Sequence, residues 1–222
     1  MDQLLKNRWA WRSLIHVVAK LWHMALLGFC AVLAMSGLAT ASGAEPKIVV
    51  VVDKVADAFM VDALIDVPVP LEIAWGVLTD IDNTASFLED MTFSKIISRT
   101  GDTLIARQDG VARFGLLSFD FVTEREVHLE PMTRITTKQI SGSFKRMRSE
   151  ATFVAIEQGV QIRYTAEIEP HSRWALMFGE PFVRREVNGQ FVQMTREMLR
   201  RHGAAQGVGG ATESSLRANE LR

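Results

Sequence analysis

Cysteine is nearly absent from this sequence. Cys30 is the only one in 222 residues, so the chain cannot close an intramolecular disulfide, and no Cys/His cluster with zinc-ligand spacing can include it. An excess of basic charge is also missing, because 25 basic side chains stand against 26 acidic ones and give a net charge of −1. These absences exclude a disulfide scaffold and a structural zinc module, and they argue against nucleic acid as a partner.

Formal charge is missing from residues 21–44, directly after a basic N-terminal leader. Residues 24–35 within this stretch are almost entirely apolar, and small residues surround Ala41 and Ala44 in the small-x-small pattern that a signal peptidase needs. This arrangement is typical of a secretory signal peptide. We therefore expect residues 1–44 to be a signal peptide, with cleavage after Ala41 or Ala44.

An uncleaved membrane anchor formed by residues 21–41 is the alternative, since roughly 20 apolar residues span a bilayer. Either interpretation places the remaining chain outside the cytoplasm, and we expect an exported, periplasmic protein. Without the first 44 residues, 178 remain, with 21 basic and 25 acidic side chains and no cysteine. A chain of this size buries enough surface for one core without covalent cross-links.

The first segments of the exported part favour two strands and a helix. Residues 47–52 are β-branched, and we assign residues 45–56 to an N-terminal strand extension. Residues 59–67 alternate between apolar and polar side chains, which predicts a half-buried strand. Residues 70–79 begin with proline and have apolar residues at helical spacing, which predicts a helix of about ten residues. A second short helix or turn carries Phe87 and its neighbours.

From residue 92 to residue 170 the pattern is that of β-structure throughout, with five or six strands. Residues 160–168 show the alternation most clearly. Turns are expected where glycine or paired polar residues occur, at residues 101–102, 109–110, 130–131, 141–142 and 158–159.

A long helix is predicted from Glu180 and Pro181 to about His202, because apolar residues recur there at steps of three and four. Gly203 is expected to cap its C-terminus. Residues 203–222 are rich in glycine, alanine and serine and predict a disordered tail. Strands followed by one long helix, with the helices on one face of an antiparallel sheet, indicate an α+β domain.

Several local motifs resemble the SRPBCC superfamily, which includes START domains and birch-pollen-allergen-like proteins. The nearest resemblance is to its polyketide cyclase/coenzyme Q-binding START-like branch. The motif Trp-x-x-Leu-x-Asp occupies residues 75–80, and a phenylalanine before a short loop occurs in residues 87–91. A proline-bearing turn and the following Gly-x-Phe occupy residues 129–134 and 142–144. The resemblance covers residues 57–202, which is essentially the whole domain.

This resemblance implies a helix-grip fold, in which a curved antiparallel sheet wraps around a long C-terminal helix and one or two short helices follow the first domain strand. In this superfamily the sheet and the helix enclose an apolar cavity for lipids, isoprenoids, quinones or polycyclic molecules. Fold membership alone does not distinguish a carrier from an enzyme. One departure concerns the cavity floor, where many relatives have a tryptophan and this chain has Ala151 and Phe153.

Arg125 and Tyr164 are the polar residues predicted to face the interior. Arg125 lies on the apolar face of its strand, and a buried arginine needs a partner, which is either an internal acidic residue or a ligand oxygen. The hydroxyl of Tyr164 likewise needs a hydrogen-bond partner, from the protein or from a ligand. The complete set of predicted cavity residues is Ile65, Phe121, Thr123, Arg125, Tyr164, Phe182, Val187, Phe191, Met194 and Met198.

No residue pattern assigns a catalytic group, a metal site or a cofactor. His128 shares a strand face with glutamates, His171 lies in a loop and His202 ends the predicted helix, so all three favour structural roles. The leading hypothesis is a protein that binds a hydrophobic small molecule or lipid, such as a quinone, a fatty acid or a polycyclic compound. The alternatives are a polyketide cyclase/dehydratase-like enzyme, in which Arg125 and Tyr164 polarise a carbonyl, and a non-catalytic envelope interaction module. The sequence does not decide whether the protein contacts a membrane, and only the N-terminal segment supports such contact.

Overall fold

The computed structural model describes residues 45–114, 117–171 and 173–220. The signal peptide or anchor predicted for residues 1–44 lies outside the described residues. No helix in the described part of the chain is both long enough and apolar enough to cross a membrane. The elements are β1 (Lys47–Val55), β2 (Ala58–Val67), α2 (Leu71–Thr79), the 3-10 helix η1 (Ile81–Ser86), β3 (Met91–Thr100), β4 (Thr103–Phe114), β5 (Leu117–Glu130), β6 (Arg134–Gly142), β7 (Phe144–Ile156), β8 (Gly159–Pro170) and α3 (Arg173–Glu220).

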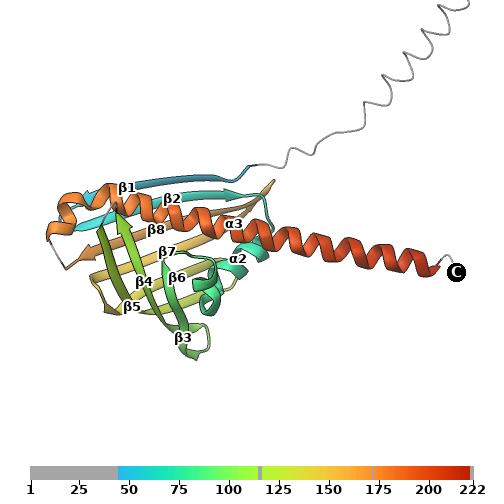
Figure 1. Ribbon diagram of the computed structural model, residues 1–222, viewed down its shortest axis with the longest axis horizontal. Helices are drawn as coiled ribbons and strands as arrows, with labels where there is room; N and C mark the ends of the chain where they lie inside the picture. Colours follow the sequence, from blue (N-terminus) through green and yellow to red (C-terminus); the bar gives the residue numbers. More distant parts are fainter. Residues whose placement is uncertain (1–44, 115–116, 172, 221–222) are drawn as a thin grey trace, which may run out of the picture. The chain divides into compact units, whose positions relative to one another are not determined.

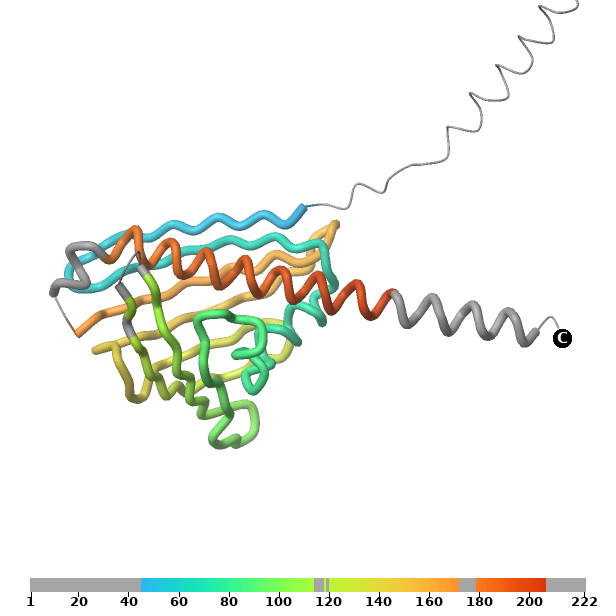
Figure 2. The backbone as a smooth tube through the Cα atoms, in the orientation of Figure 1, coloured from blue at the N-terminus to red at the C-terminus, as the bar shows by residue number. Residues whose placement is uncertain are grey.

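The eight strands form one antiparallel sheet in the order β1-β2-β8-β7-β6-β5-β4-β3. The sheet curves, and α3 lies along its concave face (Figure 1). The helix packs mainly against β1, β2, β8 and α2, whereas β4, β5 and β6 bend away from it on the other side (Figure 2). The predicted α+β helix-grip fold is therefore confirmed.

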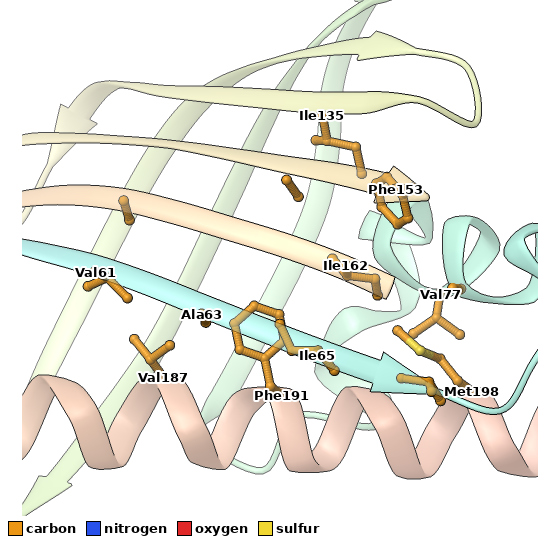
Figure 3. Close-up of a cluster of buried hydrophobic side chains, with 14 of the residues drawn as sticks. Val61, Ala63, Ile65, Val77, Ile135, Phe153, Ile162, Val187, Phe191 and Met198 are labelled. Carbon is orange, nitrogen blue, oxygen red and sulfur yellow. The ribbon is translucent and has the colours of Figure 1, made fainter. Parts of the chain in front are cut away.

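The alternating pattern of β2 determines which of its side chains enter the core. Phe59, Val61, Ala63, Ile65 and Val67 are all buried, as the sequence predicts. The apolar side of α3 meets this row, and Figure 3 shows side chains of the helix pointing toward the strand. The fully closed part of the core lies near α2, where these residues are at most 6% exposed: Ile65, Val77, Phe153, Ile162 and Met198.

Six strands lie between residues 91 and 170, which confirms the predicted number. The predicted turn at residues 109–110 is wrong, because β4 runs through it without interruption. Gly110 is a packing residue: a Cβ atom there would lie 2.3 Å from the carbonyl oxygen of Asp90 and 2.4 Å from the ring of Phe121. Gly110 is therefore needed because another segment approaches the backbone closely. Glycine has this role inside strands as well, so it does not by itself indicate a turn.

Both predicted ends of the long helix are wrong. It begins at Arg173, so Pro181 lies inside it, and it continues to Glu220 through the predicted tail. Proline fits the first turn of a helix, but that preference does not prevent further turns from preceding it. Gly203 does not adopt the positive φ of a C-cap glycine, and the alanines and glutamine that follow it favour helix.

One ion pair fixes α3 against the segment between α2 and η1, and a network within the helix supports it. The guanidinium of Arg201 lies 2.7 Å from Asp80 and 2.7 Å from Glu197, and it lies over the ring of Phe87 at 5.7 Å. Arg200 contributes two more hydrogen bonds to Glu197. These bonds hold the pKa of Glu197 down at about 2, against the opposing effect of burial. The helix is therefore attached by charge at one end of the core and by apolar packing along it.

Candidate functional site

Polar side chains collect on the concave face of β4, β5 and β6, within an otherwise apolar surface. Arg125 on β5 is directly opposite Ala106 on β4 and Gln139 on β6. A register shift between Glu124 and Arg125 lets the strand bend at this point. Arg125 lies on the inward face of the strand, because Ala106 opposite it is fully buried and its own Nε atom is buried.

Arg125 has no ionic partner among the residues that the structure describes. Its Nε atom is buried without a hydrogen-bond acceptor, and no carboxylate influences its pKa, which burial lowers and the nearby Tyr164 raises less strongly. Of the two partners left open by the sequence, the internal acidic residue is therefore not observed. A buried, unpaired guanidinium is costly to the folded state, and such a group calls for an explanation.

Tyr164 on β8 also lies in the interior, close enough to Arg125 for each side chain to influence the pKa of the other. Burial raises the pKa of Tyr164, while its hydrogen bond with the side chain of Ser149 and the charge of Arg125 act in the opposite direction. Its ring contacts Phe191 of α3 edge-to-face, with centroids 5.2 Å apart. The tyrosine thus joins the polar group to the apolar wall formed by the helix.

Two glutamines extend the polar surface along neighbouring strands. Gln108 donates a hydrogen bond to Ser94 at 2.8 Å, and Gln139 donates one to the carbonyl of Phe144 at 2.6 Å. The Oε1 atoms of both glutamines are buried without a partner. Together with Arg125, three adjacent strands therefore present buried polar atoms that lack hydrogen bonds.

Of the remaining predicted residues, Thr123 is buried and donates a 3.4 Å hydrogen bond to the carbonyl of Gln108. The others are apolar and divide into a buried group and a half-buried group. The buried ones are Ile65, Val187, Phe191 and Met198, and the half-buried ones are Phe121, Phe182 and Met194.

Sequence reasoning missed Gln108, Gln139 and Ser149. Polar residues at alternate positions are usually assigned to the solvent side of a strand, which hides them. A signal exists for Gln139, because Ile135, Thr137 and Gln139 share one side of β6 and Ile135 is buried. Residues two positions apart in a strand share a face, so an inward glutamine can be recognised once an apolar neighbour on the same face identifies the inward side.

The histidines in the described part of the chain, His128, His171 and His202, make no hydrogen bond or ion pair with this surface. His128 is exposed and lies 3.1 Å from the hydroxyl of Thr103, and His171 is also exposed. Within the described ranges, no three His, Cys, Asp or Glu side chains are grouped closely enough to hold a metal ion.

The polar group and its apolar surroundings lie within a segment that matches a known family. The family described as polyketide cyclase / dehydrase and lipid transport matches residues 67–193. No curated protein matches the chain in sequence.

Solved structures share the fold at low sequence identity. TTHA0849 from Thermus thermophilus is 14% identical, with a TM-score of 0.56 over 65% of this chain and 98% of that one. The Zhui aromatase/cyclase from Streptomyces sp. R1128 is 15% identical, with a TM-score of 0.55 over 71% and 96%. A STAR-related lipid transfer protein from Xanthomonas axonopodis is 14% identical, with a TM-score of 0.53 over 71% and 94%.

These matches confirm the resemblance to the SRPBCC and START-like superfamily, while coenzyme Q binding stays a prediction. The family match covers more than half of the chain and all of the strands that carry Arg125, Gln139 and Tyr164. This chain belongs to the polyketide cyclase / dehydrase and lipid transport family.

Proposed function

We propose that this protein binds a hydrophobic small molecule or lipid between the sheet and α3, with an oxygen-bearing end group of the ligand at Arg125. The observation that carries the proposal is the buried Nε atom of Arg125, which has no acceptor in the described part of the chain. The Nε atom itself is too buried to be reached, but Arg125 as a whole keeps some accessible surface. A ligand oxygen can therefore bond the terminal nitrogens of the guanidinium and, when it is anionic, supplies the missing charge.

Space for a ligand is supported by a contrast in burial along the concave face. Near α2 the inward side chains are fully buried, but Arg125, Leu129 and Tyr164 keep accessible surface. Loss of hydration is nevertheless the dominant influence on the pKa values of Arg125 and Tyr164. These side chains are shielded from bulk water but still have accessible surface, so they face a space inside the protein. We infer that this space holds the ligand.

The lining restricts the class of ligand. Met194, Ile168 and Leu129 are partly buried apolar side chains that pack against the core. Apolar surface of this kind suits a hydrocarbon body, and methionine adapts to ligands of different shape. One cationic group and one phenol suit a single polar end. A fatty acid, a quinone or a polycyclic phenol has this combination, so these are the classes we propose.

Binding of a matched pair of probes tests the proposal. Palmitic acid and its alcohol, hexadecanol, differ only at the end group, and native mass spectrometry and calorimetry measure their binding. We expect the acid to bind the wild type about tenfold or more tightly than the alcohol, because only the acid offers a carboxylate to Arg125. In Arg125→Met this preference disappears, while the affinity for the alcohol is retained.

Arg107→Met is the control, since this arginine lies on the adjacent strand β4 but is exposed and paired with Asp109. It should leave the preference unchanged. Failure of every lipid, quinone and polycyclic probe to bind would overturn the proposal, as would an unchanged preference in Arg125→Met. Direct extraction of lipid from the purified protein identifies the natural ligand class.

A cyclase or dehydratase activity is the second candidate, favoured by the proximity of Tyr164 to Arg125. Both groups are donors, and together they can polarise one carbonyl oxygen. Such chemistry also needs a base to remove a proton, but no carboxylate or imidazole in the described ranges influences the pKa of either residue. Binding without turnover is therefore the stronger proposal. Turnover of a poly-β-ketone substrate that is lost in Tyr164→Phe would reverse this order.

We also propose that the protein is exported, on the sequence of residues 1–44 alone. N-terminal sequencing of the protein from its own cells tests this proposal. A start at residue 42 or 45 supports a cleaved signal peptide, and an intact Met1 in a membrane fraction supports the anchor. An intact Met1 in a soluble cytoplasmic fraction would contradict both.

A further inference from the structure

The sheet has two edges, β1 and β3, and they differ in how they are protected. An edge strand presents unpaired backbone donors and acceptors that can pair with another chain. Natural proteins block this pairing with bulges, charges, short strands or a covering segment. The two edges can therefore be compared by these features.

The β3 edge carries several of these protections. Its pairing with β4 is interrupted by register shifts between Met91 and Phe93 and between Ile96 and Ser98. The 3-10 helix η1 packs against it, and the backbone N–H of Ile96 donates a 2.7 Å hydrogen bond to Asp82 at the start of η1. A neighbouring strand thus finds no straight, unpaired edge at β3.

The β1 edge has no bulge and no covering segment within the described part of the chain, and its protections are limited to the charges of Lys47, Asp53 and Lys54. Nine consecutive residues, from Lys47 to Val55, pair with β2 without a register shift. The strand contains four successive valines, of which Val49 is 44% exposed and Val51 is 49% exposed on the convex face. Figure 1 shows β1 as the outermost strand, and no described segment pairs with its free edge. This edge is straight, apolar and available.

The sequence of β1 is complementary to itself in one antiparallel register. When a two-fold axis passes through Val50, Lys47 lies opposite Asp53 of the second copy, and Val49 lies opposite Val51. The symmetry produces each of these pairs twice. All four residues are exposed on the convex face, so the two ion pairs flank a central valine cluster.

Other registers lose this match. A shift of the axis by one residue in either direction places Lys47 opposite Val51 or Val55 and leaves both charges unpaired. A register with an odd offset brings inward side chains opposite outward ones, which the pleat does not permit. The charges therefore select a single arrangement of two copies.

We propose that two copies of this protein associate through β1, in antiparallel pairing centred on Val50, so that one sheet continues across both. The strand precedes residues 67–193, which match the family, and it is separate from the surface around Arg125. The proposal therefore does not depend on the ligand.

Sedimentation velocity tests this proposal. It is run on protein purified from its own cells, in the form in which it accumulates there, at concentrations of roughly 1 to 100 µM. The wild type is expected to shift from monomer to dimer as its concentration rises. Asp53→Lys and Lys47→Asp each place like charges opposite one another at both ends of the interface, and each should weaken the dimer about tenfold or more. The double variant Lys47→Asp/Asp53→Lys exchanges the charges and should restore the wild-type constant to within about threefold.

Asp57→Lys is the matched control, because it makes the same change of charge at an exposed position just beyond β1. It should leave the dimer unchanged. Circular dichroism checks that each variant is folded. A wild type that stays monomeric over the whole range overturns the proposal, and so does a double variant that is no better than the single ones.

Discussion

At the scale of single residues, the unusual feature is a cation inside a hydrophobic fold. Arg125 is held by its position on β5 and has no internal carboxylate in the described part of the chain. The folded state without ligand carries the cost of this burial, because removing a charge from water is compensated only by a partner. Stability and binding therefore make opposite demands on this position.

The first prediction concerns the stability of the ligand-free protein. Arg125→Met removes the buried charge and keeps an unbranched side chain, so we expect the free energy of unfolding to rise by about 1 kcal/mol or more. Urea denaturation of delipidated protein measures this change. Arg107→Met, at an exposed site, should change the stability by less than about 0.5 kcal/mol. A marked loss of stability in Arg125→Met would mean that the guanidinium has an internal partner.

A second prediction concerns Gly142, in the Gly-x-Phe motif between β6 and β7. Its φ of 139° is unfavourable for other residues, and a Cβ atom would lie 2.2 Å from the carbonyl oxygen of Val122. Gly142→Ala should therefore lower the free energy of unfolding by about 2 kcal/mol or more. Gly76→Ala in α2, where a Cβ meets nothing within 4 Å, should instead raise it by up to about 1 kcal/mol. Equal effects of the two substitutions on urea denaturation would contradict this account.

At the scale of elements, strands are better predicted from this sequence than the ends of helices. The alternation in β2 and β8 follows directly from burial on one face, and both strands agree with their patterns. The ends of α3 depend on whether Pro181 and Gly203 are tolerated inside a helix, and local propensity does not decide that. The site is predictable in part: strand alternation identifies Arg125 and Tyr164, but Gln139 becomes visible only once the buried Ile135 fixes which side of β6 faces inward.

The attachment of α3 gives a prediction that depends on pH. The pKa of Glu197 is about 2 in the folded protein, below the value of about 4.3 expected for an unfolded chain. A lowered pKa stabilises the fold above the unfolded value, and this contribution is lost as the pH falls through the folded value. Glu197→Gln should therefore be less stable than the wild type by about 2 kcal/mol at pH 6, and the difference should fall to about a third of that value by pH 2.5.

Urea denaturation at a series of pH values measures this difference. Glu157→Gln, at an exposed position in the turn between β7 and β8, serves as the control and should show a small difference at every pH. A difference for Glu197→Gln that stays constant between pH 6 and pH 2.5 would rule out the proposed role of its charge.

At the scale of the whole molecule, the sheet and the helix together decide what the protein can enclose. The closed part of the core, near α2, stabilises the fold, whereas on the β4–β6 side Arg125 and Leu129 keep accessible surface among buried neighbours such as Ala106 and Val127. A ligand that binds only the folded state raises the stability by RT ln(1 + L/Kd), where L is the free ligand concentration, so the gain grows with the logarithm of that concentration. We expect a fatty acid at 100 times its dissociation constant to stabilise the wild type by about 2.7 kcal/mol. Thermal melts at several ligand concentrations measure this effect, and an unchanged melting temperature at saturation would contradict binding to the folded protein.

The pairing of β2 with β8 joins segments about one hundred residues apart, such as Phe59 with Ile168. Contacts this distant in sequence slow folding, because the chain entropy between them must be lost first. The hairpin of β1 and β2 is synthesised early, but β2 lacks its second neighbour until β8 has been made. Until then one edge of β2 is unpaired, and this is the interval in which the nascent chain depends most on assistance against aggregation.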